Sequence, residues 1–410
     1  MPSTTGNPPI RLLRNPGLDR NAPYGPAEQW VLNRTRHREV LREIRSWPGY
    51  RATPLKDLPH IAQRAGIRRL WYKDEADRFG LGSFKALGGA YGVLRVIQGE
   101  VERLTGARGG ETVPTGREIM GGAHRELASA ITVTCATDGN HGRSVAWGSG
   151  TDMFGCQCKI YLPAAVSAPR EAAIAAYGAD VVRTDSEYDE AVRQSQRDAR
   201  QHGWFVVSDT SYPAYVNIPR DVMQGYTVMV AEILEQLPAN DRPSHIFLQG
   251  GVGGLAAAFV AHLWETQGPA RPITVIVEPH RADCLFKSAA AGRPTTITDV
   301  HGTIMAGLAC GEVSLLAWYV LERGADAFLT IDDDAARWAM RLLAREDVPV
   351  VAGESGAAGL AGLLSLADDP VSRDTIDLDP SSSVLVIGTE GATDRERYDA
   401  IIGGGPPTTG

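Results

Sequence analysis

The sequence predicts an α/β fold in which parallel sheets are covered by helices, with two domains and the smaller inserted in the larger. Apolar strand-like segments alternate with helical segments from residue 131 to residue 210, which is typical of βαβ units. A second alternation begins near residue 244 and ends near residue 391. The 410 residues also exceed one ordinary hydrophobic core. We expect a large domain of residues 1–88 and 215–402, a small domain of residues 89–214 and a flexible tail, 403–410.

The first part of the chain predicts an arm, a helix, a strand and a second helix. Residues 1–60 are rich in proline and polar residues, apart from a helical pattern over 26–47. Residues 67–77 read as a strand, and residues 84–98 have the spacing of an amphipathic helix. The Gly- and Thr-rich stretch 104–125 is typical of a surface loop or an insertion.

The remaining elements follow as strands and helices in turn. In the smaller domain we expect strands over 131–137, 158–163, 179–184 and 204–210, with helices over 143–150, 168–178 and 188–203. A long helical pattern over 219–237 leads out of it. In the larger domain we expect strands over 244–250, 273–279 and 382–391, and an apolar helix after residue 254.

Composition favours a small-molecule ligand. The formal net charge of −8 argues against a nucleic-acid partner, because such proteins concentrate Lys and Arg. No segment resembles a signal peptide or approaches the roughly 20 apolar residues that cross a bilayer, so we expect a cytoplasmic protein without a membrane partner. The five cysteines are too few and odd in number for a disulfide framework, although Cys284 and Cys310 could pair if the fold brings them together. We expect no metal site.

A single lysine stands out in the segment 80–90. Lys85 lies between Phe84 and the small-residue run that opens the helix. A lysine partly removed from water loses preference for its ammonium form and can act as an amine nucleophile. The alternative is a helix-start lysine whose ammonium reaches solvent, and the spacing alone supports both interpretations equally.

The glycine-rich segment 249–255 follows an apolar strand and opens an apolar helix. Four glycines in five positions leave backbone N–H groups able to surround an anion at a helix N-terminus, so the segment predicts a phosphate site. The same text also fits a dinucleotide-binding fingerprint, since Gly251-x-Gly253-x-x-Ala256 is followed by a strand that ends in the acidic Glu278.

A polar turn, residues 137–142, joins another strand to a helix. It contains Asp138 and Asn140 at the expected carboxyl edge of a parallel sheet, where ligands collect. The carboxylate could hold a cation or move a proton, and the amide could bond a ring oxygen. Taken alone, both residues are more typical of a turn and a helix cap than of a binding site.

Together, a reactive lysine, a phosphate site and a polar turn match the needs of pyridoxal 5'-phosphate. The chain resembles the fold-type II pyridoxal-phosphate enzymes, the group of threonine deaminase and the tryptophan synthase β chain, in the segments SFKALGGAYG, ATDGNHG, GGVGGL and GESGAAG. Within that group it resembles the diaminopropionate ammonia-lyases, in KDEADRFGLGSFKALGGAYG, ATDGNHGRSVAW, DVMQGYTVMVAEI, TIMAGLACGE and GTEGATD. The likeness covers roughly residues 60–400.

This resemblance implies cofactor-binding roles. It makes Lys85 the lysine that forms an imine with the cofactor, with Phe84 beside the ring and Asn140 at the ring hydroxyl. The turn at Thr389 should face the pyridine nitrogen, although the tryptophan synthase pattern has a serine where Gly388 stands. The phosphate loop should be formed by Gly250, Gly251, Val252, Gly253 and Gly254.

The resemblance also implies a reaction. Ammonia would be eliminated from both enantiomers of 2,3-diaminopropionate, giving pyruvate and ammonia, with Lys85 and Asp138 taking the α-proton on opposite faces and Asp209 near the substrate. A carboxylate there suits a substrate with a second, cationic amino group. A homodimer is implied as well. A serine or threonine dehydratase, a β-replacement transferase, an oxidoreductase that binds a dinucleotide and a non-catalytic binding protein remain as alternatives.

Overall fold

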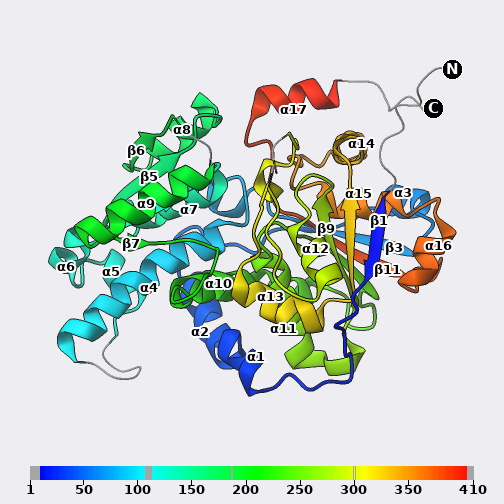
Figure 1. Cartoon of the computed structure of the whole chain (residues 1–410), viewed down its shortest axis with the longest axis horizontal. Coiled ribbons are helices and arrows are strands. Elements are labelled where there is room, and N and C mark those ends of the chain that lie inside the picture. Colours follow the sequence, from blue (N-terminus) through cyan, green and yellow to red (C-terminus); the bar gives the residue numbers. More distant parts are fainter. Residues whose placement is uncertain (1–9, 107–112, 186–187, 299, 301, 404–410) are drawn as a thin grey trace. The chain divides into compact units, whose positions relative to one another are not determined.

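The computed structural model describes residues 10–106, 113–185, 188–298, 300 and 302–403 (Figure 1). The chain forms two compact units: a larger one, Met1–Asn33, Thr53–Asp77 and Val230–Gly410, and a smaller one, Arg34–Ala52 and Arg78–Met229. The smaller unit therefore includes Lys85, which the expected domain boundaries assigned to the larger domain. Apart from residue 403, the expected flexible tail lies outside the described residues.

The larger unit is built on a seven-stranded sheet in the order β1-β10-β9-β8-β11-β3-β2. Its strands are β1 (Arg11–Arg14), β2 (Leu55–Asp57), β3 (Arg69–Asp74), β8 (His245–Gln249), β9 (Ile273–Pro279), β10 (Ala327–Ile331) and β11 (Ser383–Gly388). Its helices are α1 (Pro26–Val31), α3 (Pro59–Arg64), α11 (Gly254–Gln267), α12 (Cys284–Ala291), α13 (Leu315–Gly324), α14 (Asp333–Ala344), α15 (Ala358–Ser365), α16 (Pro370–Thr375) and α17 (Arg395–Ile402). The five central strands are parallel, whereas β1 and β2 pair antiparallel at the two edges.

Helices cover both faces of this sheet. Every residue of β8, β10 and β11 is buried, which is expected for parallel strands enclosed on two sides. Neighbouring residues of β8 show the two faces: Phe247 belongs to the core cluster that includes residues of α14 and α15, whereas Ile246 lines the same cavity as Phe259 of α11. Figure 1 shows α14 and α15 on the opposite side of the strands from α11 and α13.

The smaller unit contains a parallel four-stranded sheet in the order β6-β5-β4-β7. Its strands are β4 (Thr132–Ala136), β5 (Gln157–Leu162), β6 (Asp180–Arg183) and β7 (Phe205–Val206). Its helices are α2 (Arg34–Arg45), α4 (Ala86–Thr105), α5 (Gly116–Met120), α6 (Arg125–Ala130), α7 (Asn140–Ser149), α8 (Ala168–Ala175) and α9 (Tyr188–His202). Helix α10 (Asn217–Gln236) begins in this unit and ends in the larger one.

Two segments near the N-terminus differ from the sequence expectation. The arm contributes β1, whose Leu12 lies opposite Leu329 of β10. The single helix expected over 26–47 is two helices, because the backbone at Leu32 is extended (φ −138°, ψ 141°). No helix within the described ranges is long and apolar enough to cross a bilayer.

Candidate active site

Lys85 is the N-cap residue of α4, and small residues fix the backbone around it. A Cβ atom on Gly89 would overlap the hydroxyl of Ser144 in α7, and one on Gly88 would lie 2.5 Å from the ring of Tyr226 in α10. The Ser144 hydroxyl donates to the carbonyl of Lys85 (2.7 Å) and accepts from the N–H of Ala90 (3.1 Å). The glycines of this motif are therefore required for α4 to pack closely on α7 and α10.

The ammonium of Lys85 forms an ion pair with a carboxylate. Its Nζ atom lies 2.5 Å from Oδ2 of Asp209, which follows β7. The side chains of Lys85 and Asp209 are 20% and 15% exposed. Nζ also lies 5.3 Å from the ring centroid of Phe84 and 5.9 Å from that of Tyr226, and these two rings are 4.8 Å apart. The expected lysine and the expected acid therefore lie in contact with each other, and two aromatic rings lie beside the lysine nitrogen.

His141 completes this cluster in the smaller unit. Its Nε2 donates to the carbonyl of Val207 (2.7 Å), and its Nδ1 lies 4.0 Å from Oδ2 of Asp209. Burial lowers the pKa of His141, so the ring is neutral at neutral pH. Burial acts to raise the pKa of Asp209, but the charge of Lys85 and its hydrogen bond oppose burial, and that pKa lies well below its ordinary value.

The polar turn after β4 is organised by Thr137. Its hydroxyl accepts hydrogen bonds from the N–H groups of Gly139 and Gly142, both at 3.0 Å. Gly139 has a φ of 146°, a conformation that disfavours residues with a side chain. This turn places Asp138 and Asn140, both half-buried, at the beginning of α7, next to His141 in the chain.

The glycine-rich segment in the larger unit has the geometry of an anion site. Gly251 and Gly253 have φ angles of 60° and 95°, and Gly254 begins α11, whose first N–H groups have no acceptor within the helix. A Cβ atom on Gly250 would lie 2.5 Å from Glu278. Gln249, just before the loop, donates from Nε2 to the carbonyl of Ile387 (2.7 Å) and so ties β8 to β11. These residues fit the phosphate of the predicted cofactor.

Glu278 and two cysteines border this loop. The Glu278 carboxylate accepts from the N–H groups of Leu285 (3.0 Å) and Phe286 (2.7 Å), so it caps α12. Because these contacts occupy it, Glu278 cannot serve as the ribose-binding acid of the dinucleotide interpretation. Cys284 lies 3.6 Å from the carbonyl oxygen of Gly251, and Cys310 would lie 3.7 Å from a Cβ atom on that glycine; neither cysteine forms a disulfide.

The turn after β11 contains Thr389, which is buried. Its neighbour Glu390 accepts from the N–H of Ser355 (3.1 Å), which joins this turn to the segment GESGAAG. A Cβ atom on Gly388 would overlap the hydroxyl of Tyr72, which is fully buried and has no hydrogen-bond partner among the described residues. The position of the expected serine therefore has two hydroxyl-bearing neighbours, Tyr72 of β3 and Thr389.

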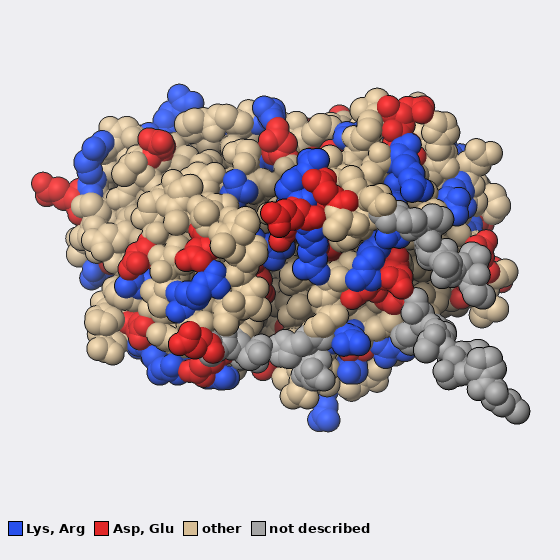
Figure 2. Space-filling model, turned by 90° about the horizontal axis from the view of Figure 1, so that it is seen from above, with Lys and Arg blue, Asp and Glu red and all other residues tan. Residues whose placement is uncertain are grey.

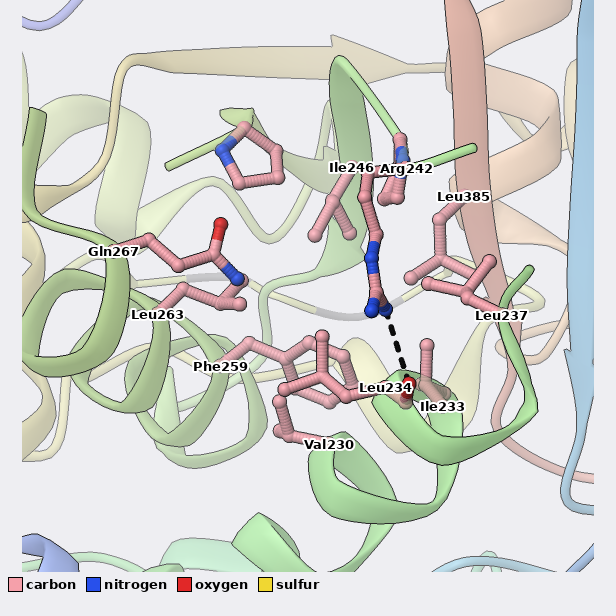
Figure 3. Close-up of a pocket in the computed structure, with 12 residues that line it drawn as sticks. Val230, Ile233, Leu234, Leu237, Arg242, Ile246, Phe259, Leu263, Gln267 and Leu385 are labelled. Carbon is pink, nitrogen blue, oxygen red and sulfur yellow. Dashed lines mark hydrogen bonds between the residues drawn. The ribbon is translucent and has the colours of Figure 1, made fainter. Parts of the chain in front are cut away.

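A separate cavity in the larger unit is apolar (Figure 3). Arg242 is its charged lining residue, and this side chain donates to the carbonyl of Leu234 at the end of α10 (3.0 Å). The cavity is lined by Val230, Ile233, Leu234, Leu237, Arg242, Pro243, Ile246, Phe259, Leu263, Gln267, Pro272 and Leu385. This lining provides neither a nucleophile nor an acid–base pair, so the chemistry belongs to the Lys85 cluster.

Comparison with known proteins decides the family. Residues 46–387 match the family model described as "Pyridoxal-phosphate dependent enzyme". The chain belongs to the pyridoxal-phosphate-dependent enzymes. This match confirms three expectations: the chain is an enzyme, its architecture is fold-type II, and its cofactor is pyridoxal 5'-phosphate.

Individual proteins, compared by sequence and by structure, are also similar to this chain. Diaminopropionate ammonia-lyase of Salmonella typhimurium is 36% identical over 398 residues, covering 94% of this chain and 96% of the relative. The crystal structure of the Escherichia coli diaminopropionate ammonia-lyase with an aminoacrylate-PLP azomethine reaction intermediate matches with a TM-score of 0.82 and 32% identity over 96% of each chain. Threonine deaminase isoform 2 of Solanum lycopersicum shares the fold, with a TM-score of 0.69 and 20% identity over 95% of this chain and 97% of that one.

Three residues of the cluster were not singled out from the sequence of this pyridoxal-phosphate-dependent enzyme. They are His141, Ser144 and Tyr226. His141 stands inside the polar turn segment, and its position there was the available signal. Ser144 and Tyr226 gave none, because their roles depend on how α7 and α10 pack against α4.

Proposed function

We propose that this enzyme eliminates ammonia from 2,3-diaminopropionate, in both the D and L forms, and yields pyruvate and ammonia. One observation carries the proposal: an ionised carboxylate, Asp209, lies 2.5 Å from the reactive amine of Lys85. A substrate with a second ammonium group gains a charge-assisted bond from such a carboxylate, whereas a hydroxyl substrate does not need one. The identity to the Salmonella relative over nearly the full length of both chains supports the same reaction.

The cofactor-binding roles are assigned residue by residue. Lys85 would react with its aldehyde, Phe84 would pack beside its ring, and Asn140 would contact its ring hydroxyl. Thr389 is assigned to the pyridine nitrogen. The phosphate is assigned to Gly250, Gly251, Val252, Gly253 and Gly254. The positive φ angles of Gly251 and Gly253 and the helix N-terminus at Gly254 suit an oxyanion.

Once bound, pyridoxal 5'-phosphate supplies an electron sink for the pair released at Cα. The chain itself supplies the proton transfers. In its neutral form, the Lys85 amine takes the α-proton of one enantiomer, and Asp138 takes that of the other. Asp209 orients the β-ammonium group and, after that group has released a proton to solvent, donates the proton with which the neutral amine leaves as ammonia.

Hydroxy-amino-acid dehydration is the alternative, since dehydratases share the fold. Rates for D-serine, L-threonine and both diaminopropionates separate the two activities. A product carrying an added thiol would instead indicate β-replacement.

The remaining partners follow from composition and family. We propose a cytoplasmic homodimer that acts on a small amino acid and binds neither nucleic acid nor membrane. Acidic and basic side chains are interspersed on the face shown in Figure 2, which suits this proposal. Sedimentation at micromolar concentration tests the dimer.

The decisive experiment is an absorbance spectrum of the protein loaded with pyridoxal phosphate, combined with that substrate panel. We expect an imine band that is absent in Lys85→Ala and retained in Lys159→Ala, whose lysine pairs with Asp180 on the surface of the same unit. A band that survives in Lys85→Ala would refute the assignment of the lysine. Faster turnover of serine than of either diaminopropionate would refute the substrate.

A further inference from the structure

His141 has one ring nitrogen whose bonding is fixed and one that is left without a partner. Nε2 lies 2.7 Å from the carbonyl oxygen of Val207, and a carbonyl can only accept, so Nε2 carries the hydrogen. In the neutral ring, Nδ1 is therefore an acceptor. This buried atom has no hydrogen-bond partner within the described part of the chain, and an unsatisfied buried polar atom is costly.

The group that Nδ1 faces is also an acceptor. Oδ2 of Asp209 lies 4.0 Å away, and the same oxygen accepts from Lys85 at 2.5 Å. Two acceptors cannot bond to each other, so the Asp209–His141 pair lacks one proton. A proton on Oδ2, with a shift of about 1 Å to hydrogen-bond distance, would satisfy both groups.

The elimination proposed above would deliver a proton to Oδ2 of Asp209. The inference made here rests on that proposed function. We propose that His141 is a positioning residue that makes Asp209 the proton carrier for the leaving ammonia, by accepting a hydrogen bond from the protonated carboxyl. When Lys85 gives up its charge, one Nζ–H bond breaks, its electron pair stays on nitrogen, and an Oδ2–H bond forms. The β-nitrogen of the substrate, a neutral amine once its ammonium has released a proton to solvent, then takes this proton as its bond to Cβ breaks.

The surroundings leave His141 as the partner for this proton. Among the residues that the structure describes, Asp209 also interacts with the titratable groups of Cys135 in β4, Tyr215 after β7 and Tyr226 in α10. Burial raises the pKa of each of them, so all three are neutral donors that do not accept a proton near neutral pH.

Two substitutions separate the two ring nitrogens. In His141→Gln the side-chain amide can still donate to the carbonyl of Val207 but offers nothing at the Nδ1 position, whereas in His141→Asn the amide oxygen can replace Nδ1. The matched control is His245→Gln in the larger unit, because His245 is also buried and its Nε2 also bonds to a backbone carbonyl, that of Ile376 (2.8 Å).

The test compares two leaving groups on the holoenzyme. A neutral β-amine needs a proton to leave as ammonia, whereas the chloride of β-chloroalanine leaves without one. We expect His141→Gln to lower the ratio of kcat for 2,3-diaminopropionate to kcat for β-chloroalanine at least tenfold, and His141→Asn to restore most of it. His245→Gln should leave the ratio within twofold of wild type. An equal loss for both substrates in His141→Gln, or no change of the ratio, overturns the proposal.

A spectroscopic titration provides a readout without turnover. If the Nδ1 acceptor stabilises a neutral Asp209, its removal leaves that carboxylate ionised, which favours the protonated form of the neighbouring lysine nitrogen. The pH at which the imine band changes should therefore rise by more than half a unit in His141→Gln, and an unchanged pH overturns the proposal. If wild type acts on serine and not on diaminopropionate, the proposed function fails, and the same ratio measured with serine still decides the role of His141.

Discussion

The hydroxyl of Tyr72 occupies the space that a side chain on residue 388 would need. Tyr72 lies on β3 and Gly388 ends the neighbouring strand β11, whose Val386 is paired with Tyr72. The glycine and the tyrosine are therefore coupled, and the serine of the tryptophan synthase pattern cannot be introduced here alone.

We expect Gly388→Ser to destabilise the protein by about 1 to 3 kcal/mol, because the core must move to admit the new atoms. Tyr72→Phe removes a buried, unpartnered hydroxyl and should cost less than about 1 kcal/mol. The double variant should recover part of the loss. Urea unfolding of the four proteins checks this, and strictly additive effects would contradict the coupling.

Gly89→Ala should separate α4 from α7 and displace Lys85. The added methyl group overlaps the Ser144 hydroxyl, which holds the carbonyl of Lys85. We expect a loss of about 1 to 3 kcal/mol in stability and a fall in kcat of at least about a hundredfold. The control is Gly99→Ala in the same helix, where nothing lies within 4 Å of the added carbon and helix propensity gains up to about 1 kcal/mol. Equal activity of the two variants would be inconsistent with the packing argument.

Lys73 and Glu232 form a fully buried ion pair at 2.7 Å in the larger unit. Lys73→Met leaves an uncompensated carboxylate and should cost about 3 to 5 kcal/mol. Adding Glu232→Leu should return most of that loss, since a hydrophobic pair of similar volume is tolerated. Thermal unfolding of the single and double variants measures both steps, and a double variant no more stable than the single would rule the explanation out.

Asp138→Asn should discriminate between the substrate enantiomers. If Asp138 removes the α-proton of the D form and Lys85 that of the L form, turnover of the D form should fall at least about a hundredfold and turnover of the L form less than tenfold. Asp209→Asn is the comparison and should impair both, because the leaving group is the same. Near wild-type turnover of the D form in Asp138→Asn would disprove the assignment of two bases.

Glu278 should make stability depend on pH. Burial raises its pKa to about 8, although two backbone N–H groups oppose the shift. Between pH 4.5 and 8 the folded state therefore holds a proton that the unfolded state releases, so stability falls as pH rises through that range. Glu278→Gln lacks this dependence, and its stability deficit relative to wild type should narrow by about 3 kcal/mol between pH 5.5 and 8.5. Urea midpoints at the two pH values measure the deficit, and a constant deficit would contradict the shift.

The sequence predicted much of the fold because its strands and helices carry clear periodic patterns. The four strands of the smaller unit lie at the expected places, since each is an apolar segment between turn residues. The split between α1 and α2 was missed because residues 32 and 33 interrupt no hydrophobic pattern. Strand β1 was missed because its polar arginines read as part of an arm, and only its pairing with β10 makes it a strand.

The site could be predicted only as far as single segments allow. Lys85 and the glycine loop could be recognised from the residues next to them in the chain. Asp209 required the family resemblance, since nothing local marks it. The role of His141 depends on the carbonyl of Val207, which lies 66 residues away and becomes its partner only after folding.

Strand β11 has a consequence for synthesis of the protein. It pairs with β3 on one side and β8 on the other, although both precede it by well over a hundred residues. Until the ribosome has released residues 383–388, the larger unit exists as two unjoined halves with bare edges. The smaller unit, in contrast, has its whole sequence by residue 229 and can fold while translation continues.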